Sequence, residues 1–358
     1  MTFAGNPLWE ALDGLLRAAP EEGVVAHRLA PLAAVMFTRS GRPIPAAWLA
    51  ELREAAIPMI AAVPVLRAVR ANCDGPVVLM KGPEVALRYP ETARSFIDLD
   101  LLVSDARATH KQLSENGFVE VGDPALYYRL HHLRPLAWPG LPLAIEIHSA
   151  PKWPDGLDLA PVVAPEVIDS ALPSGLGVDG ILAPEPGRHA LLLAAHSWAH
   201  EPFRLLRDLV DVAAIGAEAE PAEIARIARA WEIDAVWRTT SVVAAALFEG
   251  GPRPVVLRMW ARHLAAVRER TVLEGHVQKW LSGFWVLPAR EAVGQSLGAL
   301  GRDLLRAPEE RWKAKLSRTL AASRHALVPR SRHDLHLGEE ATRGRGRNPP
   351  DEDDLPVT

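Results

Sequence analysis

Residues 94–103 alternate apolar and polar side chains and end in aliphatic ones. This pattern predicts a β-strand with one buried face and one open face. Because side chains two positions apart on a strand point to the same side, Asp98 and Asp100 share one face, and Ile97, Leu99 and Leu101 lie on the other. Two adjacent carboxylates repel each other, and a divalent cation such as Mg²⁺ or Mn²⁺ relieves that repulsion. The alternative is an edge strand with both aspartates in water.

The hydrophobic pattern divides the chain into four parts. Helical periodicity dominates residues 1–72, predicted to be an N-terminal helical layer. Short strands alternate with helices over residues 73–183, the predicted catalytic core. Long helices return over residues 184–328, and residues 329–358 lack the aliphatic side chains needed to join a core, which predicts a disordered tail. The predicted class is therefore α+β.

The later helices are expected from their periodicity and from their flanking Gly and Pro residues. Their predicted ranges are 187–198, 203–216, 221–231, 235–248, 255–280 and 302–327. In the core, strands are expected over residues 77–80, 94–103, 118–121, 127–138 and 143–148.

Two further strands carry residues of chemical interest. The first runs into Lys81-Gly82, where glycine permits close backbone approach and lysine adds a positive charge before a predicted helix. An ordinary connection with a solvated lysine is the alternative there. On the strand over residues 143–148, Glu146 and His148 share one face, so Glu146 is a candidate third acid for the Asp98–Asp100 site. A cross-strand pair with a basic residue is its alternative fate.

Composition narrows the function classes. Charged residues make up 23% of the 358 residues and the formal net charge is −4, so no extended nucleic-acid footprint is indicated. The single cysteine, Cys73, excludes an intramolecular disulfide and a cysteine-rich zinc site. No signal-peptide pattern and no apolar run of membrane-spanning length is evident, and we expect a cytoplasmic protein with no membrane association.

Two helical clusters have competing interpretations. His196 and His200 are one helical turn apart, which permits a metal pair, but packing is favoured because the glutamate typical of a metalloprotease helix is absent. Arg207, Asp208 and neighbouring charges on the next predicted helix are interpreted as surface ion pairs.

Taken together, these segments resemble the uncharacterised bacterial nucleotidyltransferase family, a branch of the DNA-polymerase-β-like nucleotidyltransferase superfamily. The resemblance spans roughly residues 25–290. Its motifs are the strand ending in Lys81-Gly82, Arg94, the Asp98–Asp100 strand, the Glu146–His148 strand and the helices with His196 and Arg207-Asp208-Leu-Val-Asp211. Many relatives in the superfamily have Gly-Ser where this chain has Lys81-Gly82, and a lysine can still meet a phosphate as a point charge.

The resemblance implies a small mixed sheet of the nucleotidyltransferase type, flanked by helices, with N-terminal helices before it and a helical C-terminal domain after it. It also implies a metal-dependent transfer of an NMP group from an NTP such as ATP to an acceptor. By that likeness Asp98, Asp100 and Glu146 are the catalytic, metal-binding carboxylates for Mg²⁺ or Mn²⁺. Lys81, Gly82 and Arg94 are the expected nucleotide-binding residues. The acceptor is open between a small molecule, a peptide, a protein and a tRNA.

Two other functions compete with this one. A catalytically silent relative would act in nucleotide sensing or protein binding, but the chain retains all three acids. A metal hydrolase centred on His196 and His200 lacks a convincing acidic partner.

Overall fold

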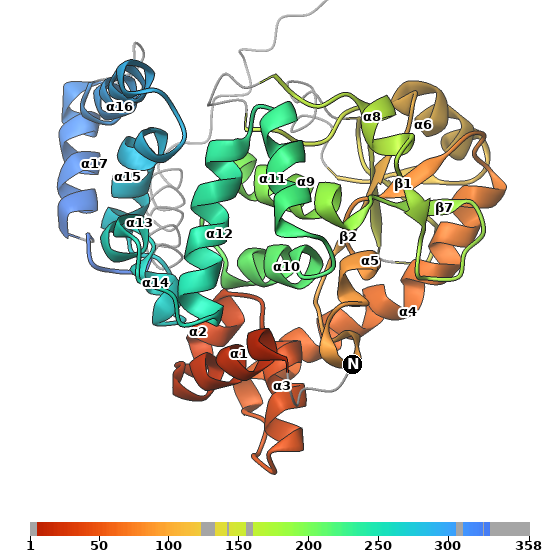
Figure 1. The fold of residues 1–358 in the computed structure, drawn as a ribbon, viewed down its shortest axis with the longest axis horizontal. Coiled ribbons are helices and arrows are strands. Elements are labelled where there is room, and N and C mark those ends of the chain that lie inside the picture. Colours follow the sequence, from red (N-terminus) through yellow and green to blue (C-terminus); the bar gives the residue numbers. More distant parts are fainter. Residues whose placement is uncertain are drawn as a thin grey trace, which may run out of the picture.

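A computed structural model describes residues 6–122, 133–141, 143–154, 160–305, 311–324 and 326–329. Part of the strand expected over residues 127–138 and the expected tail from residue 330 onward lie outside the described residues. Figure 1 shows the elements coloured along the sequence, from the N-terminal helices to the last described helix.

The N-terminal part is helical, as expected. Its helices are α1 (Pro7–Ala18), α2 (Glu21–Ala26), α3 (Ala30–Arg39) and α4 (Leu49–Ala71). Asn6 caps α1 by accepting a hydrogen bond from the backbone N–H of Leu8. The long α4 contains Pro58 and Pro64, yet it continues through both. Helices α1, α2 and α3 lie at the bottom of Figure 1, and α4 runs from there along the side of the molecule that holds the sheet.

The middle part supplies the sheet. Its elements are β1 (Val77–Leu79), α5 (Pro83–Ala86), β2 (Asp98–Leu102), α6 (Ala106–Glu115), β3 (Val119–Glu120), β4 (Leu136–Ala137), β5 (Ala144–His148), α8 (Ala164–Ile168), β6 (Leu172–Pro173) and β7 (Ile181–Ala183). The seven strands lie in the order β3-β4-β5-β2-β1-β7-β6. The central strand β2 is antiparallel to β1 and parallel to β5, and β1 is parallel to β7. The sheet is therefore mixed, and the α+β class is confirmed.

The last part is helical again. Its helices are α9 (Pro186–His200), α10 (Leu206–Gly216), α11 (Pro221–Ala230), α12 (Asp234–Phe248), α13 (Val255–Met259), α14 (Arg262–Ala265), α15 (Val272–Leu281), α16 (Ala289–Leu304) and α17 (Trp312–Arg324). None of the described helices is both long and apolar enough to cross a membrane.

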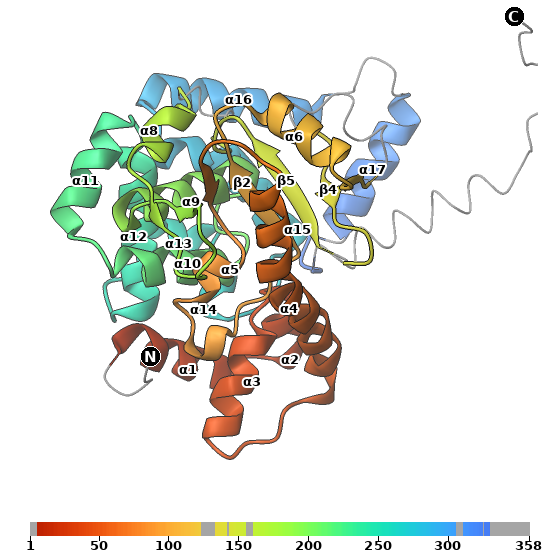
Figure 2. The same ribbon diagram turned by 90° about the vertical axis from the view of Figure 1, so that its right-hand side faces the viewer.

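Two hydrophobic clusters sandwich the sheet. On one face, Leu99 and Leu101 of β2 pack with residues of α4, α6 and the neighbouring strands. On the other face, Leu102 of β2 belongs to a larger cluster that includes α9, α10 and the N-terminal helices. Figure 2 shows β2 and β5 side by side with α4 passing along the sheet. The face of β2 that carries the aspartates is thus the face covered by α9.

Three predictions for individual elements need correction. The helix expected over residues 255–280 is three helices, because α13 ends at Met259 and Thr271 caps the start of α15 in a capping box with Glu274. The helix expected over residues 302–327 is α17 preceded by α16, which the sequence reasoning missed. Residues 94–97 precede β2, and Ile97 is 61% exposed instead of buried. The four-part division of the chain stays a prediction.

Candidate functional site

The carboxylates meet because β2 and β5 are parallel and in register. Asp100 lies directly opposite Glu146, and Asp98 lies opposite Ala144. Since facing residues of paired strands lie on the same side of a sheet, Asp98, Asp100, Glu146 and His148 share one face. Asp100 and His148 are buried, whereas Asp98 and Glu146 are half-buried. The alternation read from the sequence therefore correctly grouped Asp98 with Asp100 and Glu146 with His148, and the pairing of β2 with β5 brings the two groups to one side.

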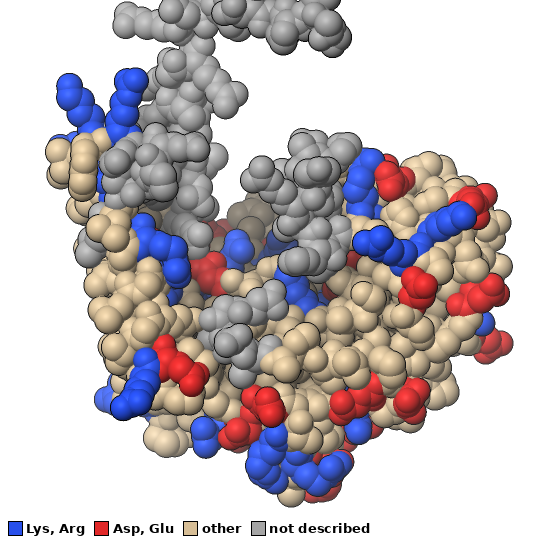
Figure 3. Space-filling view, turned by 90° about the horizontal axis from the view of Figure 1, so that it is seen from above, with Lys and Arg blue, Asp and Glu red and all other residues tan. Residues whose placement is uncertain are grey.

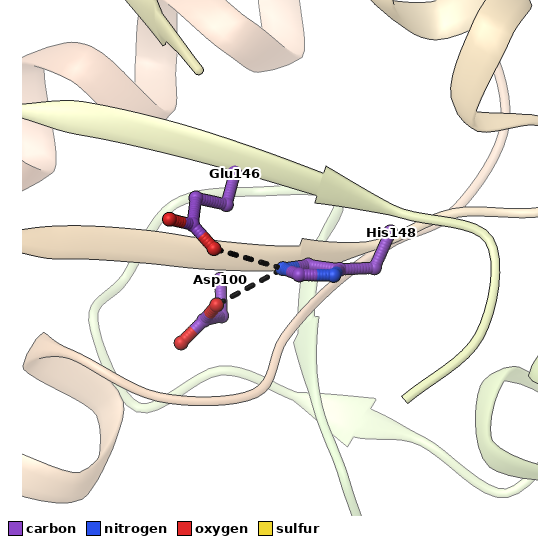
Figure 4. Close-up of side chains that lie close together, drawn as sticks. All are labelled: Asp100, Glu146 and His148. Carbon is purple, nitrogen blue, oxygen red and sulfur yellow. Dashed lines mark hydrogen bonds and ion pairs between the residues drawn. The ribbon is translucent and has the colours of Figure 1, made fainter. Parts of the chain in front are cut away.

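Asp100, Glu146 and His148 form a compact group (Figure 4). His148 Nε2 lies 3.0 Å from Asp100 Oδ1 and 3.7 Å from Glu146 Oε2. One ligand atom of each of the three residues lies within 4.8 Å of the others, close enough to share a metal ion. The sequence predicts only a supporting role for His148. Its contact with Asp100 depends on the pairing of β2 with β5, which the sequence does not specify.

Burial and like charge control the ionisation of this group. Burial and the negative charge of Asp100 raise the pKa of Asp98. The pKa of Glu146 is raised in the same way, by burial and by the charges of Asp100 and Asp98. For Asp100 burial acts in the same direction, but the hydrogen bond from His148 and the charge of Lys81 outweigh it and lower the pKa. One firmly ionised carboxylate thus lies between two that bind protons more readily.

The turn after β1 brings Lys81 to the same face. The backbone N–H of Met80 donates to Asp100 O at 2.9 Å, which fixes the end of β1 against β2. Gly82 has φ 73°, and a Cβ there would lie 3.2 Å from Asp98 O, so glycine meets both the backbone conformation and the close approach. Burial lowers the pKa of Lys81 to about 8, although Asp100 favours its charged form. The predicted Lys81-Gly82 turn therefore adjoins both aspartates.

A pocket lies between this turn, the end of β5 and α9. It is lined by Met80, Lys81, Asp100, His148, Pro151, Lys152, Leu192, Leu193 and His196. Its wall combines apolar side chains with the basic residues Lys81, Lys152 and His196 and with the buried Asp100. His189 anchors α9 here, with its Nε2 2.7 Å from Met80 O. Sequence reasoning missed Lys152, which stands in a loop without a recognisable pattern.

Arg94, predicted to bind nucleotide, lies behind this turn. Its side chain is 4% exposed and forms two ion-paired hydrogen bonds with Asp211 of α10, at 2.7 and 2.6 Å. Tyr89 also donates to Asp211 at 2.7 Å, and Arg94 Nη1 contacts Gly82 O at 3.4 Å. Arg94 thereby ties the Gly82 turn to α10. Its contact with a nucleotide stays a prediction.

His196 and His200 lie against each other on α9, with ring centroids 4.6 Å apart and ring planes tilted by 55°. Burial and the charge of Lys81 hold the pKa of His196 well below its usual value. Burial and the charge of Lys152 lower the pKa of His200 to about 4. Within the described ranges, neither histidine belongs to a group of three side chains that could hold a metal. Neutral imidazoles beside lysines fit a pocket wall better than a separate metal centre.

The donor set on β2 and β5 fits a divalent cation. Asp100 and Glu146 offer hard oxygen ligands, and His148 offers a nitrogen that Mn²⁺ accepts more readily than Mg²⁺. Asp98 lies outside that compact group, and its role as a ligand stays a prediction. Over the face shown in Figure 3, acidic and basic side chains are interspersed on the described surface. The described charges that stand out are therefore the three carboxylates on the sheet face, Asp98, Asp100 and Glu146, which we call the carboxylate row.

A mixed sheet with a carboxylate row at its centre and a lysine-containing pocket beside it defines a candidate metal- and phosphate-binding enzyme. Comparison with protein families finds a match to the uncharacterised nucleotidyltransferase family over residues 21–249. The chain belongs to this family. Neither the comparison with curated proteins nor the comparison with solved structures yields a match. The resemblance inferred from the motifs is thereby confirmed at the level of the family.

Proposed function

We propose that the protein is a metal-dependent nucleotidyltransferase that moves an NMP group from an NTP to an acceptor hydroxyl or phosphate. One observation carries the proposal: the register of β2 and β5 places Asp100 beside Glu146 and His148, next to a pocket that contains Lys81. The three carboxylates on this sheet face, Asp98, Asp100 and Glu146, are costly to ionise together unless a cation neutralises them. Membership in a nucleotidyltransferase family supports the same reaction.

Asp100, Glu146 and His148, with Asp98 as a fourth candidate, would hold the cation. When bound, a divalent cation neutralises phosphate charge and lowers the barrier to displacement at phosphorus. Lys81 and Lys152 supply positive charge in the adjacent pocket for the triphosphate. The apolar wall formed by Met80 and Leu192 is suited to the flat face of a base or the edge of a sugar.

The transfer then needs one proton acceptor. The oxygen of the acceptor attacks the α-phosphorus, a new P–O bond forms, and the bond to the leaving pyrophosphate breaks. Glu146, which faces Asp100 across the paired strands, takes the proton from the attacking hydroxyl. His148 holds Asp100 in place through its hydrogen bond. Lys81 stabilises the charge that develops on the departing phosphates.

The experiment that tests this function is incubation of the protein with each NTP, labelled at the α-phosphate, in the presence of a cell extract. Parallel reactions contain Mg²⁺, Mn²⁺ or a chelator. We expect label to be transferred to a discrete acceptor with one metal present and not with the chelator. The imidazole in the ligand set predicts that Mn²⁺ supports the reaction at least as well as Mg²⁺.

An Asp100→Asn variant serves as the matched control for contaminating activities in the extract. Label that appears equally with this variant would not come from the site. Nucleotide that binds without any transfer in all extracts would favour the silent relative instead.

A further inference from the structure

A second charged region lies at the Asp98 end of the carboxylate row, away from the pocket. Arg28 stands in the turn between α2 and α3, Glu51 in the first turn of α4, and Arg207 in the first turn of α10. Ser95, three residues before Asp98, links two of them: its hydroxyl donates to Arg28 O at 3.4 Å, and its carbonyl accepts from Arg207 Nη1 at 3.4 Å. The N-terminal helices therefore reach the site.

The charges in this region are poorly satisfied by the protein. Both carboxylate oxygens of Glu51 are buried and find no hydrogen-bond partner among the described residues, and the same holds for Arg207 Nε. The other nitrogens of Arg207 make long contacts, of 3.4 Å to Ser95 O and 3.4 Å to Asp208 Oδ1. The described residues offer the exposed Arg28 side chain no hydrogen bond or ion pair. Since buried polar groups are nearly always hydrogen-bonded, such a cluster indicates a ligand-binding surface.

The cluster is electrostatically coupled to the site. Asp98 and Arg207 attract each other, and the fields of Arg207, Arg204 and Asp98 all act on Arg28. Burial raises the pKa of Glu51 to about 7, against the opposing charges of Arg28 and Arg207. At neutral pH Glu51 therefore both accepts and donates hydrogen bonds, as a partner for a hydroxyl requires.

We propose that Arg28, Arg207 and Glu51 bind the acceptor of the nucleotidyl transfer, and that this acceptor carries an oxyanion, a phosphate or a carboxylate, beside its hydroxyl groups. The inference rests on the proposed function. In-line displacement places the attacking and leaving groups on opposite sides of the α-phosphorus. With the triphosphate in the pocket at Asp100, the acceptor enters from the side of Asp98.

The test uses three probes of matched size with the full chain: glycerol 3-phosphate, glycerate and neutral glycerol. Their binding is measured by saturation-transfer NMR for the wild type, Arg28→Met, Glu51→Gln and the control Arg226→Met. Arg226 is an exposed arginine of α11 paired with Glu223, so its loss removes the same charge elsewhere. Calorimetry with an ATP analogue that cannot be cleaved between the α- and β-phosphates measures nucleotide affinity in parallel.

We expect one or both charged probes to bind the wild type and Arg226→Met, and glycerol not to bind. Arg28→Met should weaken that binding by about tenfold, the usual effect of losing one charge-assisted hydrogen bond, and leave nucleotide affinity unchanged. The phosphate and carboxylate probes then show which oxyanion is preferred. Glu51→Gln should weaken binding less, because an amide retains hydrogen bonding.

Two results would overturn the acceptor site. One is equal binding of the charged probes by Arg28→Met and the wild type, or no binding by either. The other is a loss of nucleotide affinity in Arg28→Met, which would assign the arginines to the triphosphate. If the wild type binds no nucleotide analogue, the proposed function fails, and these residues cannot be the acceptor site of that transfer. Oxyanion binding that depends on Arg28 would then still show that Arg28, Arg207 and Glu51 form an oxyanion-binding site.

Discussion

Two groups of charged side chains lie close to β2, and their charges are satisfied in opposite ways. Arg94 and Asp211 pair through two short hydrogen bonds, and Tyr89 satisfies Asp211 further. Asp100 and Glu146 face each other on the adjacent strands β2 and β5. Their shared neighbour is His148, which carries a positive charge only when it is protonated. The first group is complete within the protein. In the second, the nearby Lys81 only partly offsets the carboxylates, because burial and mutual repulsion still raise the pKa values of Asp98 and Glu146.

This difference separates structural charge from charge that serves a ligand. A buried charge with its hydrogen bonds made holds elements together, and its loss leaves a partner unpaired. Carboxylates that crowd together on one sheet face cost stability until a cation binds, and this crowding raises the pKa values of Asp98 and Glu146. Removing one of these carboxylates should therefore affect the reaction more than the stability. The predictions below test this division from the largest expected effect to the smallest.

Asp100→Asn should reduce nucleotidyl transfer by about a thousandfold, equivalent to ~4 kcal/mol of barrier, because it removes the most firmly ionised ligand of the row. The measurement is label transfer per folded molecule, with circular dichroism to verify folding. Asp105→Asn is the matched control, since asparagine caps α6 as well as aspartate does. Activity close to wild type in Asp100→Asn would contradict the metal assignment.

Arg94→Met should lower the free energy of unfolding by about 3–5 kcal/mol, because it leaves Asp211 buried without its charge partner. Denaturant unfolding measures this effect. The control is Arg39→Met on the exposed Arg39–Glu91 pair, which should cost no more than about 1 kcal/mol. A variant that stays fully stable but loses nucleotide affinity would instead place Arg94 on the nucleotide, as the sequence predicts.

Glu146→Gln should lower turnover by about a hundredfold, the typical effect of removing a general base, with nucleotide affinity largely unchanged. Single-turnover rates and nucleotide titrations on one preparation separate the two quantities. Glu120→Gln on β3 is the control, because Glu120 pairs with Arg134 at the sheet edge. A fall in melting temperature without a fall in rate would identify Glu146 as structural.

Lys81→Ala should weaken nucleotide binding by about tenfold, because one cation contact to phosphate is lost. The wild type should also show a pH dependence that this variant lacks. The pKa of Lys81 is lowered to about 8, so its charge is present below that pH and is lost as the pH rises through it. Nucleotide affinity, measured by calorimetry from neutral to alkaline pH, should fall accordingly. Lys111→Ala on α6 is the exposed control.

Period-two alternation predicted the faces of β2 and β5 correctly, because that rule depends only on the pleat of a strand. The same rule could not predict that Asp100 would lie opposite Glu146, since register is set by pairing between strands distant in sequence. Arg94 shows a further limit. Its partner Asp211 lies on a helix far along the chain, and an arginine beside an acidic motif looks the same in sequence whether it faces a ligand or a carboxylate.

Strands β6 and β7 escaped prediction because they are short and their pairing partners, not their own pattern, define them. The missed role of the N-terminal layer has a similar cause. Arg28 lies in a turn and Glu51 in a helix of a segment whose pattern indicates only packing, and the tertiary structure brings both to the Asp98 end of the carboxylate row.

The pairing of β1 with β7 has a consequence for synthesis of the chain on the ribosome. Val77 pairs with Ile181, so the central sheet cannot be completed until β7 has emerged, and Arg94 has to wait longer still for Asp211. A nascent chain that stops short of α10 therefore exposes sheet edges and an unmatched guanidinium, which makes it prone to aggregation and dependent on chaperones. Slow decoding between residues 183 and 211 would prolong this vulnerable stage.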